Sequence, residues 1–283
     1  MTLPLRSDAV ADLQARITEL WEHRSEIAKG DVEAKATVDE AIDALDRGEL
    51  RVAEIHPETR EVTVNIWLKH AILLLFQLSE MATMEVGPFT YVDKIPLKRD
   101  FTGVRVVPGA SARWGSHLEP GVILMPSYVN IGARVGAGTM VDTWATVASC
   151  AQIGRNVHLS GGVGIGGVLE PAEARPVIVE DDCFVGSRCM IVNGARVRRG
   201  SILGAGVILS GSIPVIDAQT GEEVGRGDIP ERSVVVQATR PRRYPGGEFG
   251  LACALIVRRL AEGEKHGDIT LENTLREHGI AID

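Results

Sequence analysis

The sequence predicts a mainly β fold, a left-handed parallel β-helix of hexapeptide repeats, with an N-terminal α-helical domain and a C-terminal β extension. Two observations predict it. An aliphatic residue recurs at every sixth position through the middle of the chain. In addition, the 283 residues are 45% apolar but only 4% aromatic, and they include 31 glycines. Narrow stacked coils favour Val and Ile, exclude large rings and use glycine at tight corners.

The six-residue repeat occurs in two runs, separated by a phase slip of two residues across 170–176. Three short strands with their turns would form one triangular coil, and the small residues four places after each aliphatic, such as Cys183 and Cys189, should also point inward. A less regular stretch from Val104 predicts a further coil. The repeating aliphatics are Ile123, Val129, Val135, Val141, Val147, Ile153, Leu159 and Ile165, then Val179, Val185, Ile191, Val197, Leu203 and Leu209.

Residues 1–100 form the predicted N-terminal, mainly helical domain. Its helices are indicated by apolar residues at helical spacing, by capping residues and by a terminating glycine. The expected elements are a helix capped by Ser7, a helix stopping near Gly48, strands at 51–55 and 61–64, and a helix at 66–78 capped by Asn65. Residues 83–100 are expected to be irregular, because two prolines interrupt them.

The β-helix is predicted over residues 101–212, and residues 213–283 form the predicted C-terminal part. That part begins with a hairpin around 217–221. Strands follow within 233–259, on either side of a basic loop at 240–243, and the tail at 271–278 is expected to form a short helix.

Charge and composition exclude several classes of function. The net charge of -8 argues against binding to nucleic acid or to an anionic membrane surface. Asp8, Asp12 and Glu19 interrupt the N-terminus, so no signal peptide is expected, and the longest apolar run, 71–78, is too short to span a bilayer. The four cysteines form no CxxC pair, so we expect no metal site, no disulfide scaffold and a cytoplasmic location.

One hexad departs from the small and aliphatic pattern around it. Asp142 and Trp144 follow the repeat residue Val141, so both should lie on the outside of the coil. They are either a solvated corner with a ring packed on the outer face, or a carboxylate placed in a cleft. His158 should also face outward, and a neutral imidazole there is a candidate general base, although a lone histidine is weak evidence.

The glycine-rich segment 160–167 resembles a dinucleotide-binding loop, but the aliphatic repeat runs through it and no βαβ unit surrounds it. We expect its glycines to keep one face flat, so that a long ligand can approach the backbone. No lysine lies between Lys98 and Lys265, so arginine or backbone N–H groups would have to bind any phosphate in this part of the chain. The candidate arginines are Arg196, Arg198, Arg199, Arg240, Arg242 and Arg243.

Several segments resemble the tetrahydrodipicolinate N-succinyltransferase family. The resemblance extends over nearly the whole chain and is most specific in the repeats. The segments that carry it are 124–132, 140–147, 149–154 and 156–171 in the repeats, and 51–54 and 67–69 upstream.

The resemblance implies a homotrimer with active sites between neighbouring subunits. It implies succinyl transfer from succinyl-CoA, a co-substrate and not a tightly bound cofactor, to the amino group of L-2-amino-6-oxopimelate in lysine biosynthesis. The family's substrate-binding arginine falls on Arg105, and its catalytic, amine-binding aspartate falls on Asp142. The pantetheine arm is expected along the flat face, and the predicted CoA contacts are Ser160, Gly162, Gly166, Gly204 and Arg240.

One departure from the family pattern leaves the acyl donor open. Many family members carry a glutamate, a candidate acid–base partner of the aspartate, where this chain has Met190. Acetyl-CoA is therefore an alternative donor for the same acceptor. A hexapeptide acyltransferase acting on a sugar or serine, and a non-catalytic β-helix scaffold, are two further hypotheses for the function. Arg105 and the Asp142 hexad argue against the sugar or serine enzyme.

Overall fold

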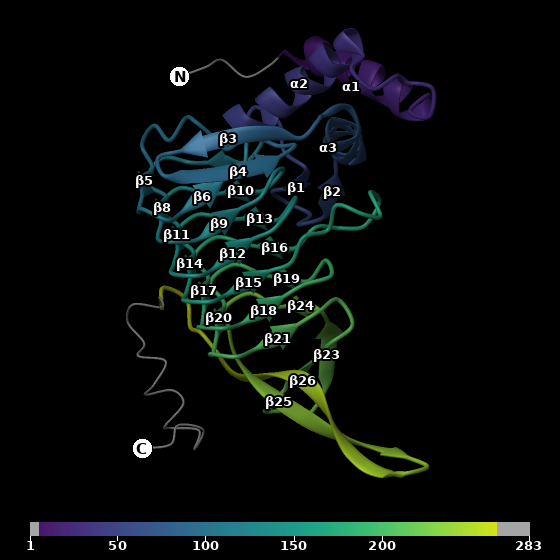
Figure 1. The fold of residues 1–283 in the computed structure, drawn as a ribbon. Coiled ribbons are helices and arrows are strands. Elements are labelled where there is room, and N and C mark those ends of the chain that lie inside the picture. Colours follow the sequence, from purple (N-terminus) through teal and green to yellow (C-terminus); the bar gives the residue numbers. More distant parts are fainter. Residues whose placement is uncertain (1–5, 265–283) are drawn as a thin grey trace.

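The centre of the molecule is a stack of short parallel strands arranged in three sheets, each strand pairing with the strand three further along the chain (Figure 1). The computed structural model describes residues 6–264, so the predicted helix at 271–278 lies outside the described residues. We call the three sheets together the parallel stack. Among the described residues, no helix is long and apolar enough to cross a membrane.

Sheet one contains β5 (Arg105–Val106), β8 (Ile123–Leu124), β11 (Met140–Val141), β14 (His158–Leu159), β17 (Phe184–Val185) and β20 (Ile202–Leu203), and continues into C-terminal strands. Sheet two contains β7 (His117–Leu118), β10 (Arg134–Val135), β13 (Gln152–Ile153), β16 (Ile178–Val179), β19 (Arg196–Val197) and β24 (Asp228–Ile229). Sheet three contains β6 (Ser111–Ala112), β9 (Tyr128–Val129), β12 (Thr146–Val147), β15 (Gly164–Ile165), β18 (Met190–Ile191) and β21 (Ile208–Leu209).

The core of the stack consists of the repeating aliphatics. Every predicted repeat position from Val129 to Leu209 is buried, as are the small positions Cys183 and Cys189. The first predicted position is wrong: Ile123 is only half-buried, and Leu124 fills the core beside Val141. The reason is that the step in sequence from Leu124 to the next core residue, Val129, is five positions and not six. The extra coil predicted from Val104 is present as β5, β6 and β7.

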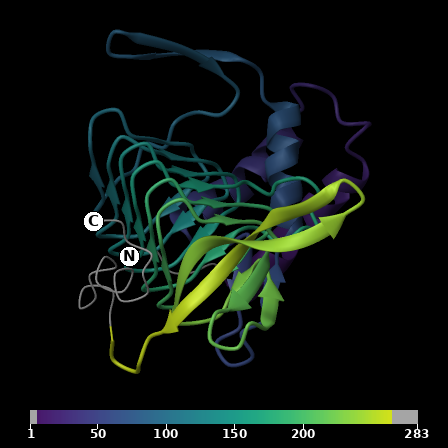
Figure 2. The ribbon, with the colours of Figure 1, turned by 90° about the horizontal axis from the view of Figure 1, so that it is seen from below.

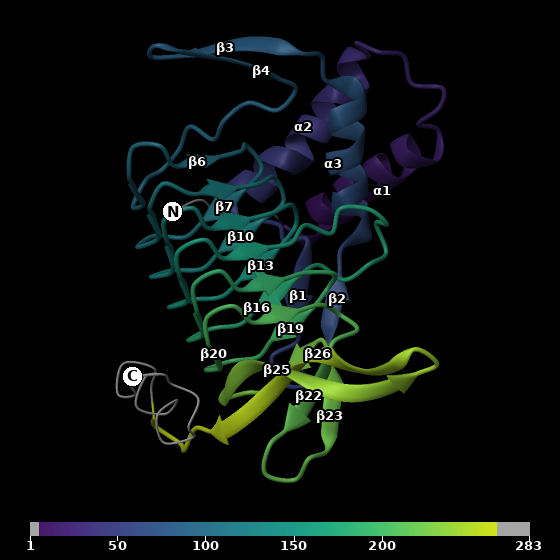
Figure 3. The same ribbon diagram turned by 60° about the horizontal axis from the view of Figure 1, so that its bottom comes forward.

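The predicted phase slip is a long connection between β15 and β16, residues 166–177, that leaves the stack (Figure 3). Lys69, fully buried, holds it by donating a hydrogen bond from Nζ to Ala174 O at 2.5 Å. Burial lowers the pKa of this lysine. Leu169 packs against the core of the N-terminal helices and not inside the stack, because the connection has already left the coil there.

The N-terminal helices are α1 (Ser7–Glu22), α2 (Val32–Arg47) and α3 (Ile66–Leu78), with the hairpin β1 (Ala53–Ile55) and β2 (Val62–Val64) between the last two. Gly48 ends α2 in the left-handed conformation, as predicted. One of the two predicted caps is wrong, because Ser7 is itself helical and Arg6 precedes it as the N-cap residue. Asn65 is the N-cap residue of α3, as predicted, but its side chain donates to Arg51 O instead of capping the helix, which ties the helix to the hairpin.

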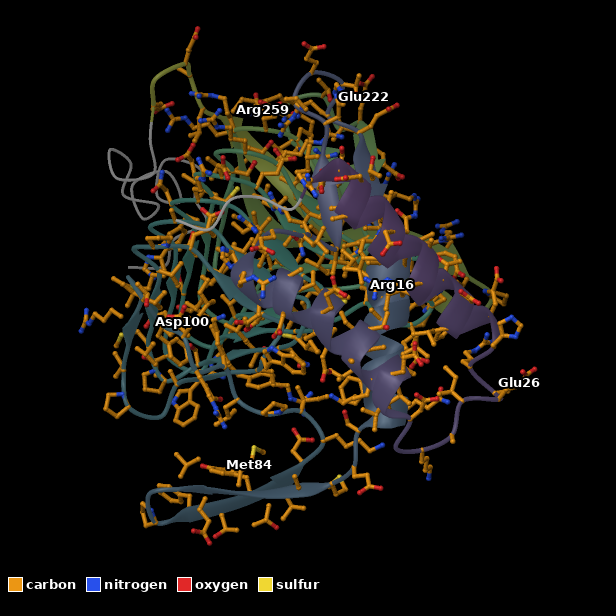
Figure 4. All side chains as sticks on the ribbon, turned by 90° about the horizontal axis from the view of Figure 1, so that it is seen from above. Arg16, Glu26, Met84, Asp100, Glu222 and Arg259 are labelled. Carbon is orange, nitrogen blue, oxygen red and sulfur yellow. The ribbon has the colours of Figure 1, made fainter. Side chains whose placement is uncertain are left out.

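The segment expected to be irregular, 83–100, contains an antiparallel hairpin, β3 (Ala82–Val86) and β4 (Phe89–Asp93). Pro88 does not break the strands because it lies in the turn, next to Gly87 with φ 59°. Figure 4 shows Met84 on this hairpin, set apart from the helix that carries Arg16.

At the other end, β22 (Pro214–Asp217) and β23 (Glu223–Arg226) form the predicted hairpin. The chain then forms β25 (Ser233–Tyr244) and β26 (Gly247–Arg259), a long antiparallel pair that extends beyond the stack (Figure 2). The basic segment 240–243 is therefore strand and not loop. Pro241 opposes Gly250 in this pair.

Candidate functional site

Sheet one brings Asp142 into line with two of the residues predicted to contact CoA. Asp142 follows the end of β11, and its backbone N–H donates to Leu159 O. Ser160 holds the equivalent position on the next strand, and Gly204 holds it two strands further on, as their backbone hydrogen bonds show. Neighbouring strands lie about 4.8 Å apart. A line of small residues therefore leads away from the carboxylate across one sheet edge.

The Asp142 carboxylate is held by local hydrogen bonds. The Thr143 backbone N–H donates to Oδ1 at 2.6 Å and the Thr143 hydroxyl lies 3.2 Å from the same oxygen. His158 Nε2 lies 3.5 Å from Oδ2. The Thr143 N–H, more than the nearby imidazole, lowers the pKa of Asp142 below its usual value. The group is therefore ionised at neutral pH and serves as a hydrogen-bond acceptor.

His158 is the partner that sequence reasoning undervalued. It stands on β14 directly beside Met140, two residues before Asp142. The ring of Phe184, on the next strand, contacts the imidazole edge-on with centroids 5.3 Å apart. The sequence already indicated this contact, because residues eighteen positions apart pair in the stack. His158 therefore lies on the strand next to the one that precedes Asp142.

Arg105 lies on the same sheet as Asp142. It is exposed on β5, where it pairs with Ile123, and Ile123 pairs with Met140. Two strand spacings, about 10 Å, thus separate Arg105 from the β11 backbone. Arg105 forms no ion pair with a residue of the described part, so its guanidinium is available to a ligand.

The corner between sheets one and three carries two further residues of interest. Trp144 is 77% exposed and has a φ of 61°, so its ring is not used by the core. Gly162 lies one coil along with φ 70°, and its N–H donates to Thr143 O. Gly162 thus directly supports the residue that binds Asp142.

Sheet three holds two residues that the structure does not bring to Asp142 within one chain. Gly166 follows β15, and a side chain there would approach Val192 at 2.9 Å, so packing alone explains the glycine. Met190 lies on β18 and is 43% exposed. Both belong to a different sheet from the one that carries the carboxylate.

The candidate phosphate-binding arginines divide into two groups. Arg196, Arg198 and Arg199 all form ion pairs with carboxylates of the stack. Arg240 lies instead in the β25–β26 pair, beside a cavity of about 220 Å³ that Arg226 and Arg242 also line. Its nearest carboxylate is Glu223, at 3.6 Å. Among the described residues, no group of three or more His, Cys, Asp or Glu side chains is placed to hold a metal ion.

Short parallel strands stacked with a six-residue repeat are typical of one class of proteins, the hexapeptide-repeat acyltransferases. Two family models match parts of the chain. One, described as the N-terminal part of tetrahydrodipicolinate N-succinyltransferase, matches residues 12–78, and another, the hexapeptide repeat of succinyl-transferase, matches residues 176–210.

The chain belongs to the 2,3,4,5-tetrahydropyridine-2,6-dicarboxylate N-succinyltransferase family. A relative with that name from Paramagnetospirillum magneticum is 49% identical over 89% of this chain and 94% of its own length. Another from Caulobacter vibrioides is 46% identical over 95% of this chain and 100% of its own length. A solved structure of a protein described as a 2,3,4,5-tetrahydropyridine-2-carboxylate N-succinyltransferase, from Campylobacter jejuni, aligns with TM-score 0.49 and 18% identity, covering 78% of this chain and 62% of that one.

Proposed function

We propose that the protein transfers a succinyl group from succinyl-CoA to the amino group of L-2-amino-6-oxopimelate, the ring-opened form of tetrahydrodipicolinate, in the route to lysine. The observation that carries the proposal is that Asp142 and Arg105 lie on the same sheet, sheet one. An anionic hydrogen-bond acceptor and a cation are thus two strands apart. A substrate with one amine and two carboxylates needs both signs of charge. Arginine binds a carboxylate with two parallel hydrogen bonds.

In this mechanism Asp142 orients the attacking amine. The neutral amine nitrogen bonds to the thioester carbon, the oxyanion collapses, and the CoA thiolate leaves as the amide forms. The nitrogen loses one proton, which the departing thiolate takes up to become the CoA thiol, and the ionised Asp142 accepts a hydrogen bond from the nitrogen and favours this loss. His158, 3.5 Å away, steadies the carboxylate and acts through it as a positioning residue.

The acyl-CoA co-substrate is proposed to lie along the line from Asp142 through Ser160 to Gly204. The next two positions on this line after Ser160 are Gly186 and Gly204, which lack side chains. Packing alone explains Gly186, where a side chain would approach Ala205 N at 2.6 Å, so Gly204 is the position at which a pantetheine arm is proposed to approach the backbone. Gly162 serves the same path by shaping its corner, and Arg240 with its neighbours is proposed to meet the phosphates. Gly166 is proposed only as a close-approach position on the adjoining sheet, since packing already explains it.

The proposed assembly is a cytoplasmic homotrimer of left-handed parallel β-helices with sites between neighbouring subunits. The support is that sheet one presents Asp142 and Arg105 on an outer face, while Met190 lies on a different outer face. A residue on sheet three, such as Met190, is therefore proposed to reach the Asp142 site of a neighbouring subunit and not that of its own chain. The three proposed regions of the chain remain 1–100, 101–212 and 213–283.

The test measures thiol release with L-2-aminopimelate as the acceptor, comparing succinyl-CoA with acetyl-CoA. We expect turnover with a clear preference for succinyl-CoA. An acetyl preference would replace the donor but keep the acceptor, and no turnover with either would support a scaffold instead.

Asp142→Asn should lower kcat/KM by about a hundredfold or more, the usual scale for a lost acid–base group. Asp182→Asn is the control, because Asp182 is a carboxylate at another corner of the stack, paired with Arg199 and outside the proposed site. Arg105→Ala should raise KM for the amine substrate more than KM for succinyl-CoA. A change of less than about threefold in Asp142→Asn would remove that carboxylate from the mechanism.

A further inference from the structure

A second cavity lies between the β1–β2 hairpin and sheet two. Its volume is about 210 Å³, and its lining includes Arg51 and Ile55 from the hairpin segment and Gln152, Ile178 and Asp181 from the stack. None of the residues assigned to acyl transfer lines it. It lies on a different sheet from Asp142, so the proposed reaction gives no reason for its charges.

Most charged groups around this cavity neutralise one another. Glu180 accepts from Arg196 Nε at 2.7 Å and also from Arg60. Arg199 pairs with Asp182 at 3.1 Å. Asp181, which lines the cavity, accepts a backbone N–H bond at 2.8 Å. Glu180 and Asp182 are therefore paired with arginines, whereas Asp181 forms no ion pair with a residue of the described part.

Arg51 is the exception. It forms no ion pair with any carboxylate in the described range, and its one side-chain contact is from Nε to Gln152 Oε1, at 3.4 Å. Burial lowers the pKa of this guanidinium most and Arg134 lowers it further, whereas the carboxylates of Glu119, Glu54 and Asp181 act in the opposite direction. Arg134 is itself paired with Glu119 at 2.6 Å, so what Arg51 lacks within the described residues is a counter-charge in direct contact with its guanidinium.

Gln152 is fixed so that it cannot supply that counter-charge. Its Nε2 donates to Cys150 O, two residues earlier in the same coil, at 3.0 Å, and to Gly132 O on the preceding coil at 3.3 Å, which turns the neutral Oε1 toward Arg51. The apolar side of the cavity is formed by Ile55 and Ile178, which give a ligand a dry wall but no charge. The missing group is an anion that can approach the two terminal nitrogens of Arg51.

We propose that this cavity is a binding site for a small anion, one carboxylate or phosphoryl group held by the Arg51 guanidinium. The volume falls below the roughly 300 Å³ at which sites for drug-sized ligands begin, so the ligand is small. A carboxylate and a phosphate both present two oxygens at the spacing of a guanidinium fork. Because the chain carries a net charge of -8, such binding depends on this local site and not on the overall field.

The experiment uses the intact protein with inorganic phosphate and with malonate in separate titrations, at ionic strength matched with sodium chloride. Binding is followed by calorimetry and by the shift of the unfolding temperature, since a ligand of the folded state raises that temperature. We expect saturable binding of one or both anions, and the two titrations distinguish a phosphoryl from a carboxylate ligand. Arg51→Gln should weaken binding by about tenfold or more, whereas Arg99→Gln, at an exposed arginine elsewhere, should not change it.

A second variant separates binding from folding. Ile55→Phe fills the cavity and leaves every charge in place, so it should also abolish binding while the protein remains folded. The absence of saturable binding to the unmodified protein, with either anion, would overturn the proposal. So would binding that Arg51→Gln and Ile55→Phe leave unchanged, because the anion would then occupy another site.

Discussion

Replacing Leu124 and Ile123 one at a time tests where the first coil begins. Leu124 has 0% exposure and lies in the core beside Val141, whereas its neighbour Ile123 is half-buried on the outer face between Arg105 and Met140. The two substitutions, Leu124→Ala and Ile123→Ala, remove the same number of carbon atoms. Only their direction in the coil differs.

The expected loss for Leu124→Ala is about 3 kcal/mol. Removing three buried carbons costs about 0.8 kcal/mol each in transfer free energy, and the cavity left in a narrow coil adds to this. Ile123→Ala should cost about 1 kcal/mol or less, because its side chain already contacts solvent. The difference between the two variants is therefore about 2 kcal/mol.

The assay is urea unfolding followed by far-ultraviolet circular dichroism, at one protein concentration for all variants. The free energy of unfolding is compared at equal m value, so that a change in midpoint reports stability. An equal or larger loss in Ile123→Ala would refute the five-residue step and restore the uninterrupted six-residue frame.

Three further outcomes are expected. His158→Gln should lower kcat/KM less than Asp142→Asn does, because the imidazole, 3.5 Å away, acts through the carboxylate. Adding His158→Gln to Asp142→Asn should therefore lower kcat/KM by less than about threefold further. If the losses of the two single variants multiply in the double variant, this reasoning is contradicted. Lys69→Met should speed amide hydrogen exchange over residues 166–177 but not over β11, because only that connection loses its 2.5 Å hydrogen bond to Lys69. If residues 166–177 exchange equally slowly in the variant and the unmodified protein, Lys69 does not hold the connection in place. Burial raises the pKa of Cys183 to about 12, so in the folded protein the thiol stays protonated at pH values where the unfolded chain ionises. The stability that this protonated thiol contributes is present below about pH 9 and is lost as the pH rises toward 12. In Cys183→Ala the free energy of unfolding should therefore fall less steeply between these pH values. An equally steep fall in the variant would argue against burial of the thiol.

The parallel stack and its core follow from the six-residue repeat alone. A period of six repeated over many coils restricts the fold strongly, because each aliphatic must stack on the one eighteen residues before it. It also placed Asp142 and Trp144 outside the core. Local features were harder to predict: the cap residues were assigned from type alone, whereas Asn65 is used to bind Arg51 O. The β3–β4 hairpin was missed because its proline lies in the turn.

Which outward residues meet is visible only in the folded chain. The pairing of strands brings His158 next to Asp142 and sets Arg105 on the same sheet, but it sends Met190 to another. It also leaves Arg51 half-buried with no direct ion pair to a described residue, at a junction between segments a hundred residues apart. Periodicity fixes whether a side chain points inward. Which neighbours it meets outside depends on the phase of each coil and on the docking of the N-terminal hairpin, and both are settled by long-range packing.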